Sequence, residues 1–168
     1  MNHPVIKIHV KDFGTMTAEL YPEMAPLTVA NFLSLIEKKF FDGLIFHRVI
    51  RGFMLQGGGY TPEMEHKECE AIKGEFLANG CRTNTLKHTR GVLSMARTNM
   101  PNSASSQFFV MHENAPHLDG QYAGFGKVIE GDEIIDKIAS VPTGNYGWYM
   151  QDVPMEPVVI ETMEIVSE

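Results

Sequence analysis

The chain has 168 residues, 43% of them hydrophobic and 21% charged, which suits one globular domain over residues 1–168 and is too short for two. Its 14 Lys and Arg residues against 21 Asp and Glu leave a net charge of −7, which argues against nucleic-acid partners, because their binding depends on cations that neutralise phosphates. Only two cysteines, no apolar run of about 20 residues and no signal-peptide pattern occur, which excludes a disulfide scaffold and a membrane-spanning protein and predicts a cytoplasmic location.

Two segments near the N-terminus alternate between apolar and polar residues. In residues 5–11 every second side chain is apolar, and residues 15–21 repeat the pattern after a turn at residues 12–14. Alternation on both sides of a turn that contains Asp and Gly predicts an antiparallel hairpin. Pro26 then opens a stretch in which apolar residues recur at helical spacing, so residues 26–38 are predicted to form an amphipathic helix.

Short apolar segments separated by glycines fill the middle of the chain. LIFHRVI, GFMLQGG, GVLSMA and SQFFVM have the length of β-strands, whereas the polar residues 60–90 predict a surface loop. A further strand, GFGKVI, precedes a second predicted helix that starts at Gly131. Residues 142–157 contain three prolines and two glycines and predict a long loop, and residues 158–166 predict a closing strand. This order indicates a β-barrel or sandwich with two helices.

Three groups of residues resemble other chemical motifs only in part. His112 and His117 lie five positions apart with a proline between them, whereas two zinc ligands from one helix must share a face. The glycines at 57–59 lack the Lys-Ser/Thr pair that completes a phosphate-binding loop. No metal or nucleotide site is therefore predicted. The third group consists of Cys69, Cys81 and His66, and its spacing matches no zinc site. The two cysteines are therefore predicted to be buried or unreactive thiols.

Long segments of the sequence resemble the cyclophilins, the peptidyl-prolyl cis-trans isomerases. The resemblance rests on FHRVIRGFMLQGG, on GVLSMART followed by NSASSQFFVM, and on HLDGQYAGFGKVIEG, and it extends from about residue 5 to residue 166. It implies a mainly β fold, a closed eight-stranded antiparallel β-barrel capped by two α-helices. Short connecting loops suggest a compact, bacterial-type member of the family.

The resemblance also implies an active site. Arg48 in FHR resembles the catalytic arginine, and Gln56 and Gln107 resemble the glutamines that orient it and contact the substrate backbone. The residues that match the apolar pocket for the substrate proline are Phe53, Met54, Phe109 and Leu118, and those that match its supporting core are Phe46 and Phe125.

Further positions of the implied site differ from the family pattern. Ala96 and Arg97 match the edge segment whose main chain pairs with the peptide, where relatives often carry Asn in place of Arg97. His117 replaces a tryptophan, and this change predicts weak cyclosporin binding with catalysis retained. Tyr122 replaces a histidine and keeps an aromatic wall with a polar tip, so we expect a pocket of altered polarity.

The function implied by the resemblance is cis-trans isomerisation of Xaa-Pro bonds in proline-containing peptides and unfolded protein chains, assisting protein folding. The reaction makes no covalent bond, so it requires neither a cofactor nor a metal, and a monomer is expected. One other function stays open, and a third lacks support. A cyclophilin-fold adaptor would bind proline peptides but turn them over slowly. A small-ligand carrier would need an open barrel interior, which the family fills with side chains.

Overall fold

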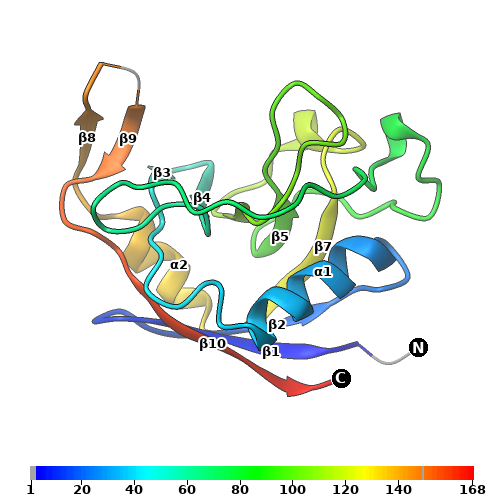
Figure 1. Ribbon diagram of the computed structural model, residues 1–168, viewed down its shortest axis with the longest axis horizontal. Coiled ribbons are helices and arrows are strands. Elements are labelled where there is room, and N and C mark those ends of the chain that lie inside the picture. Colours follow the sequence, from blue (N-terminus) through cyan, green and yellow to red (C-terminus); the bar gives the residue numbers. More distant parts are fainter. Residues whose placement is uncertain (1–2, 149) are drawn as a thin grey trace.

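A curled antiparallel sheet organises the computed structural model, which describes residues 3–148 and 150–168 (Figure 1). Its eight strands are β1 (Val5–Val10), β2 (Gly14–Leu20), β3 (Arg48–Ile50), β4 (Met54–Gly57), β5 (Val92–Met95), β6 (Phe108–Met111), β7 (Gly124–Glu130) and β10 (Ile160–Ser167). They follow the order β10-β1-β2-β7-β5-β6-β4-β3. Helix α1 (Pro26–Glu37) packs against β10, and helix α2 (Asp132–Ala139) packs against β2, β3 and β4.

The two edge strands of the sheet, β10 and β3, do not pair with each other; instead, the segment before β3 pairs with Val159 and with Ile160 at the start of β10. Ile45 and Val159 form an isolated antiparallel bridge there. Beside it, the Phe46 N–H donates to the Val158 carbonyl over 3.0 Å. Among the described residues no ladder joins β10 to β3 themselves. The eight antiparallel strands and two helices predicted from the sequence are confirmed, and the sheet is a half-barrel rather than a barrel closed by a continuous ladder.

The predicted hairpin and both predicted helices are confirmed. Ile6 and Ile8 on β1 are fully buried and lie opposite buried residues of β2, as their alternation requires. In α1, Pro26 occupies the first turn, where its missing N–H costs nothing. Gly131, at φ +83, is the N-cap residue directly before α2, and a Cβ there would collide with the Thr15 carbonyl. No helix in the described ranges has the length and apolarity needed to cross a bilayer.

The segment 60–90 is only partly the predicted surface loop, because it carries buried polar residues. Glu75 is 6% exposed, and its Oε1 accepts hydrogen bonds from the Thr28 N–H at 2.6 Å and the Thr28 hydroxyl at 2.7 Å. The carboxylate thus binds the positive end of α1. The side-chain amide of Asn84, 4% exposed, donates to the carbonyls of Glu75 and Gly124. These bonds hold the loop against the sheet.

The second predicted loop, 142–157, is wrong in part, because it contains a two-stranded hairpin. Strands β8 (Thr143–Tyr146) and β9 (Met150–Pro154) pair with each other and form a separate sheet. Figure 1 shows this hairpin rising from the body of the molecule beside β3, and β9 contacts β3. Short strands that end at Pro and Gly have the same composition as an irregular loop. The sequence therefore does not distinguish a hairpin from a loop here.

Aromatic rings fill the space between α1 and the sheet. The ring of Phe32 on α1 lies 4.9 Å from those of Phe41 and Phe125 and 5.3 Å from that of Phe108, measured between centroids. Phe46 packs edge-on against Phe108. All five rings are at most 1% exposed. The expected positions of Phe46 and Phe125 in the core are confirmed.

We expect Glu75→Gln to lower the free energy of unfolding by about 1–2 kcal/mol, because the amide keeps one acceptor oxygen but loses the charge at the start of α1. Urea unfolding at pH 7 measures this. Glu70→Gln, a change of an exposed residue of the same loop, is the matched control and should stay within about 0.5 kcal/mol of the parent. Equal stability of Glu75→Gln and the control would show that the carboxylate charge contributes nothing.

Candidate active site

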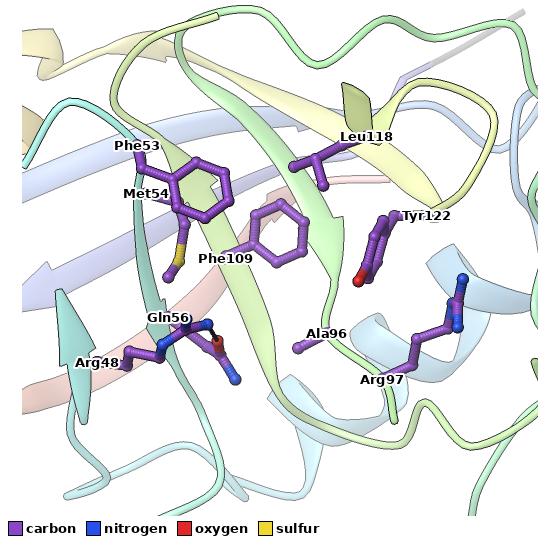
Figure 2. Close-up of a pocket in the computed structure, with 9 residues that line it drawn as sticks. All are labelled: Arg48, Phe53, Met54, Gln56, Ala96, Arg97, Phe109, Leu118 and Tyr122. Atoms are coloured by element: carbon purple, nitrogen blue, oxygen red, sulfur yellow. Dashed lines mark hydrogen bonds between the residues drawn. The ribbon is translucent and has the colours of Figure 1, made fainter. Parts of the chain in front are cut away.

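A cavity of about 150 Å³ lies on the side of β4 and β6 that faces away from the aromatic core (Figure 2). All nine residues that line it are among the eleven predicted site residues: Arg48, Phe53, Met54, Gln56, Ala96, Arg97, Phe109, Leu118 and Tyr122. The two others lie beside it. Gln107 borders an adjoining cavity with Gln56 and Ala96, and exposed His117 lies at the rim with its ring 5.8 Å from that of Phe53.

Strand register brings side chains from four strands into one row. Arg48 on β3 lies opposite Gln56 on β4, Gln56 lies opposite Phe109 on β6, and Phe109 lies opposite Ser94 on β5. Residues opposite one another in antiparallel strands point to the same face of the sheet. Met54 is two positions before Gln56 and shares that face. The site is therefore built across four neighbouring strands.

Hydrogen bonds fix the polar end of the cavity. The Arg48 Nη1 donates to Gln56 Oε1 over 3.3 Å, and Gln56 Nε2 donates to Gln107 Oε1 over 3.0 Å (Figure 2 shows the first of these). The main-chain carbonyl of Gln107 accepts from the Ala96 N–H at 3.0 Å. The Gln56 amide can therefore present only its oxygen to Arg48, so the guanidinium stays directed at the cavity.

The apolar wall formed by Phe109 is supported from behind by His88, which the sequence did not single out. The two rings stack with centroids 6.0 Å apart. The His88 imidazole, 1% exposed, is hydrogen-bonded to the Ser94 hydroxyl at 2.7 Å and to Asp119 at 3.2 Å. Burial lowers the pKa of His88, and Asp119 opposes this shift in part. The neutral His88 ring, which is fixed by two hydrogen bonds, thus holds Phe109 in place.

Arg97 forms the opposite end of the cavity and is held by two aromatic rings. Its guanidinium lies 4.5 Å from the ring centroid of Phe76 and 4.6 Å from that of Tyr122. It also donates to the Gln121 carbonyl, at 2.6 Å from Nη2. Phe76 and Gln121 are more than 20 positions away from Arg97, so no local pattern could have identified them. Arg97 and Tyr122, two of the three positions that differ from the family pattern, thus stack on each other.

The two histidines of the HENAPH segment lie in different environments. His112 Nδ1 accepts the Gly52 N–H at 2.8 Å, and its Nε2 lies 3.0 Å from Asp136 on α2. His117 instead lies at the cavity rim. Within residues 3–148 and 150–168 no three His, Cys, Asp or Glu side chains gather as metal ligands would. His112 fixes the turn that precedes Phe53, because its own N–H also donates to the Phe53 carbonyl at 2.9 Å.

Comparison with known proteins identifies the family. The sequence from residue 5 to residue 165 matches the family model described as cyclophilin type peptidyl-prolyl cis-trans isomerase/CLD. The chain belongs to the cyclophilin family. This confirms the resemblance found in the sequence, and it makes the protein an isomerase of that class.

Relatives cover nearly the whole of this cyclophilin. It is 46% identical over 162 residues to a peptidyl-prolyl cis-trans isomerase of Acinetobacter baylyi. The match covers 93% of this chain and 82% of the relative. It is 43% identical over 161 residues to peptidyl-prolyl cis-trans isomerase B of Escherichia coli K12, with 90% and 94% covered. The crystal structure of a cyclophilin-type isomerase from Cryptosporidium parvum superposes with a TM-score of 0.81 at 28% identity, over 99% of both chains.

One buried histidine of this cyclophilin adjoins Arg48. His47 is 5% exposed, its ring centroid lies 4.5 Å from that of Tyr60, and its Nδ1 has no hydrogen-bond partner among the described residues. Burial, and secondarily the positive charge of Arg48, lower the pKa of His47 to about 4. The folded protein therefore favours the neutral imidazole.

We expect this shift to make stability fall in mild acid. An unfolded histidine has a pKa near ~6.5, so the contribution of neutral His47 is complete above that pH and is lost as pH falls toward 4. The full difference is about 3 kcal/mol. Urea unfolding of the parent and of His47→Phe at pH 7.5, 5.5 and 4 tests this. The free energy of unfolding of the parent minus that of His47→Phe should fall steadily with falling pH. A difference that stays constant would refute the shift.

Proposed function

We propose that this cyclophilin isomerises Xaa-Pro bonds of proline-containing peptides and unfolded chains in the cavity between Arg48 and Tyr122. The observation that carries the proposal is the hydrogen-bonded series Arg48–Gln56–Gln107 beside an apolar cavity. A cyclophilin-type isomerase of Cryptosporidium parvum was solved in the presence of the dipeptide Ala-Pro, with a TM-score of 0.79 to this chain. The apolar side chains receive the proline ring, and Arg48 faces its nitrogen.

The chemistry needs a donor and a grip on the ring. Rotation about an Xaa-Pro bond breaks amide resonance against a barrier of about 20 kcal/mol. At the twisted transition state the proline nitrogen becomes pyramidal and regains a lone pair. A hydrogen bond from Arg48 to that lone pair forms only then, as rate acceleration requires. Arg48 suits this role because its guanidinium stays charged and offers several donors in a fixed plane.

Arg48 cannot supply the whole rate enhancement. A charge-assisted hydrogen bond contributes roughly 1.5–3 kcal/mol, which corresponds to about 10- to 150-fold. Shortening isomerisation from tens of seconds to milliseconds takes a factor of about 10⁴, or roughly 5.5 kcal/mol. The remainder comes from holding the proline ring against Met54 and Phe109, which are 2% and 5% exposed, while the other side of the amide rotates.

We expect Arg48→Ala to lower the isomerisation rate at least tenfold without unfolding the protein, because the lost bond exists chiefly in the transition state. A protease-coupled or NMR exchange assay on an Ala-Pro peptide measures the rate, and circular dichroism monitors the fold. Arg51→Ala, which removes an exposed arginine three positions along, is the matched control and should retain the parent rate. Wild-type activity in Arg48→Ala would contradict the assigned role.

A second candidate function is peptide binding with slow turnover. The exposed His117 at the rim and the Arg97–Tyr122 stack are the observations that favour it, because they alter the wall that faces the substrate. The same assay separates the two functions. A binding module would hold the Ala-Pro peptide, visible as shifted peptide resonances, and leave its exchange rate close to the uncatalysed value.

We expect His117→Trp to tighten cyclosporin inhibition about 30- to 150-fold while peptide turnover changes little. The indole adds one donor and apolar area at the cavity rim, worth roughly 2–3 kcal/mol, whereas desolvating an imidazole against an apolar ligand is costly. Inhibition constants of both proteins at one pH measure the change. Nanomolar inhibition of the unmodified protein, or no gain from tryptophan, would show that His117 does not border the drug site.

We further infer that the protein assists folding as a monomer in the cytoplasm. Cys69 and Cys81 are free thiols, as suits a reducing compartment. We also infer that the half-barrel is closed in solution through the pairing of the segment before β3 with the start of β10. The hydrogen bond between Gly43 N–H and the Ile160 carbonyl, at 2.8 Å, supports this closure.

A further inference from the structure

A second cavity lies on the other side of Arg48, between β3 and the β8–β9 hairpin. It measures about 280 Å³ and is lined by His47, Arg48, Met150, Gln151 and Asp152. We call this second cavity the hairpin cavity, and the cavity of about 150 Å³ described above the proline cavity. Arg48 lines both of them. A peptide seated with its proline ring in the first cavity therefore has a continuation past Arg48 into the second.

The charges of the hairpin cavity favour a cation. The Asp152 carboxylate is partly exposed, and no ion pair or hydrogen bond engages it within the described chain. Arg48 also lines the cavity, but its Nη1 is bonded to Gln56 on the side of the proline cavity. His47 is neutral near pH 7, because burial favours the uncharged ring. Asp152 is thus the one anionic group among the residues that line this cavity.

The position of the cavity indicates which part of a substrate enters it. The resemblance implies that the main chain of Ala96 and Arg97 pairs with the peptide, and the subsite below assumes that this part of the peptide precedes the proline. Figure 2 shows Arg48 and Arg97 at opposite sides of the proline cavity. A peptide that approaches along Ala96 and Arg97 therefore leaves on the side of Arg48, where the hairpin cavity opens.

We propose that the hairpin cavity is a substrate subsite that takes a Lys or Arg side chain at the position directly following the proline. The Asp152 carboxylate would accept hydrogen bonds from the ammonium or guanidinium group, and the Gln151 amide oxygen offers a second acceptor. The Met150 side chain offers apolar contact for the methylene stem. This inference rests on the proposed function, because it assumes a proline bound beside Arg48.

Substitution of Asp152 by Asn tests the subsite. Asp152 has φ +60, a left-handed conformation that Asn also tolerates, so the backbone is kept while the charge is lost. NMR exchange rates would be measured on peptides that differ only in Lys, Gln or Glu after the proline. We expect the parent to turn over the Lys peptide about three- to tenfold faster than the Glu peptide. The ratio should fall below about twofold in Asp152→Asn.

Two further variants make the test specific. Gln151→Glu adds a second carboxylate to the same cavity and should raise the Lys-to-Glu ratio above that of the parent. Glu161→Gln removes one negative charge from an exposed site on β10 and should leave the ratio unchanged. Added salt should reduce the parent ratio, because the partly exposed pair is screened.

The outcomes separate the subsite from the proposed function. If the parent turns over the neutral Gln peptide but shows no preference for Lys, or if Asp152→Asn keeps the preference, the subsite is refuted and the isomerase proposal stands. If the Gln peptide itself is not turned over, the proposed function fails. A ratio that changes equally in Glu161→Gln would assign the preference to net charge and would also overturn the subsite.

Discussion

The register between four strands is the constraint on which the active site depends. Arg48, Gln56, Phe109 and Ser94 come from β3, β4, β6 and β5, and they share a face only because each lies directly opposite the next. A slip of one residue in any pair would turn the following side chain to the opposite face. The buried aromatic core on the other face opposes such a slip, since Phe108 would then have to leave it.

The long segment between β4 and β5 contains no regular strand, and it connects this sheet to α1 and to the Arg97 end of the cavity. Glu75 binds the start of α1, and the adjacent Phe76 lies under the Arg97 guanidinium. Arg97 in turn lies against Tyr122, whose ring meets Phe109 edge-on at 5.9 Å. Helix, loop and cavity wall are therefore joined by a short series of contacts. A structural change in this loop would therefore shift Arg97, at one end of the cavity, before it affected Arg48 at the other.

Sequence periodicity predicted the local elements, and family resemblance predicted the site. Alternation and helical spacing identified the first hairpin and both helices, whereas the nine cavity residues follow from matched motifs, because no spacing rule joins Arg48 to Tyr122. Burial of Glu75 and His88 was missed, since each depends on a partner at least 30 positions away. The β8–β9 hairpin was missed because its prolines and glycines are equally typical of loops.

Neighbouring residues of β6 serve opposite sides of the sheet. Phe108 contacts the aromatic core, and Phe109 forms the wall of the proline cavity. A displacement of this strand moves both rings together, so packing around Phe32 and the shape of the cavity cannot vary independently. Sequence change that alters substrate choice is therefore least constrained at the other walls, on the turn around Leu118 and on the hairpin beyond Arg48, where side chains have no counterpart in the core.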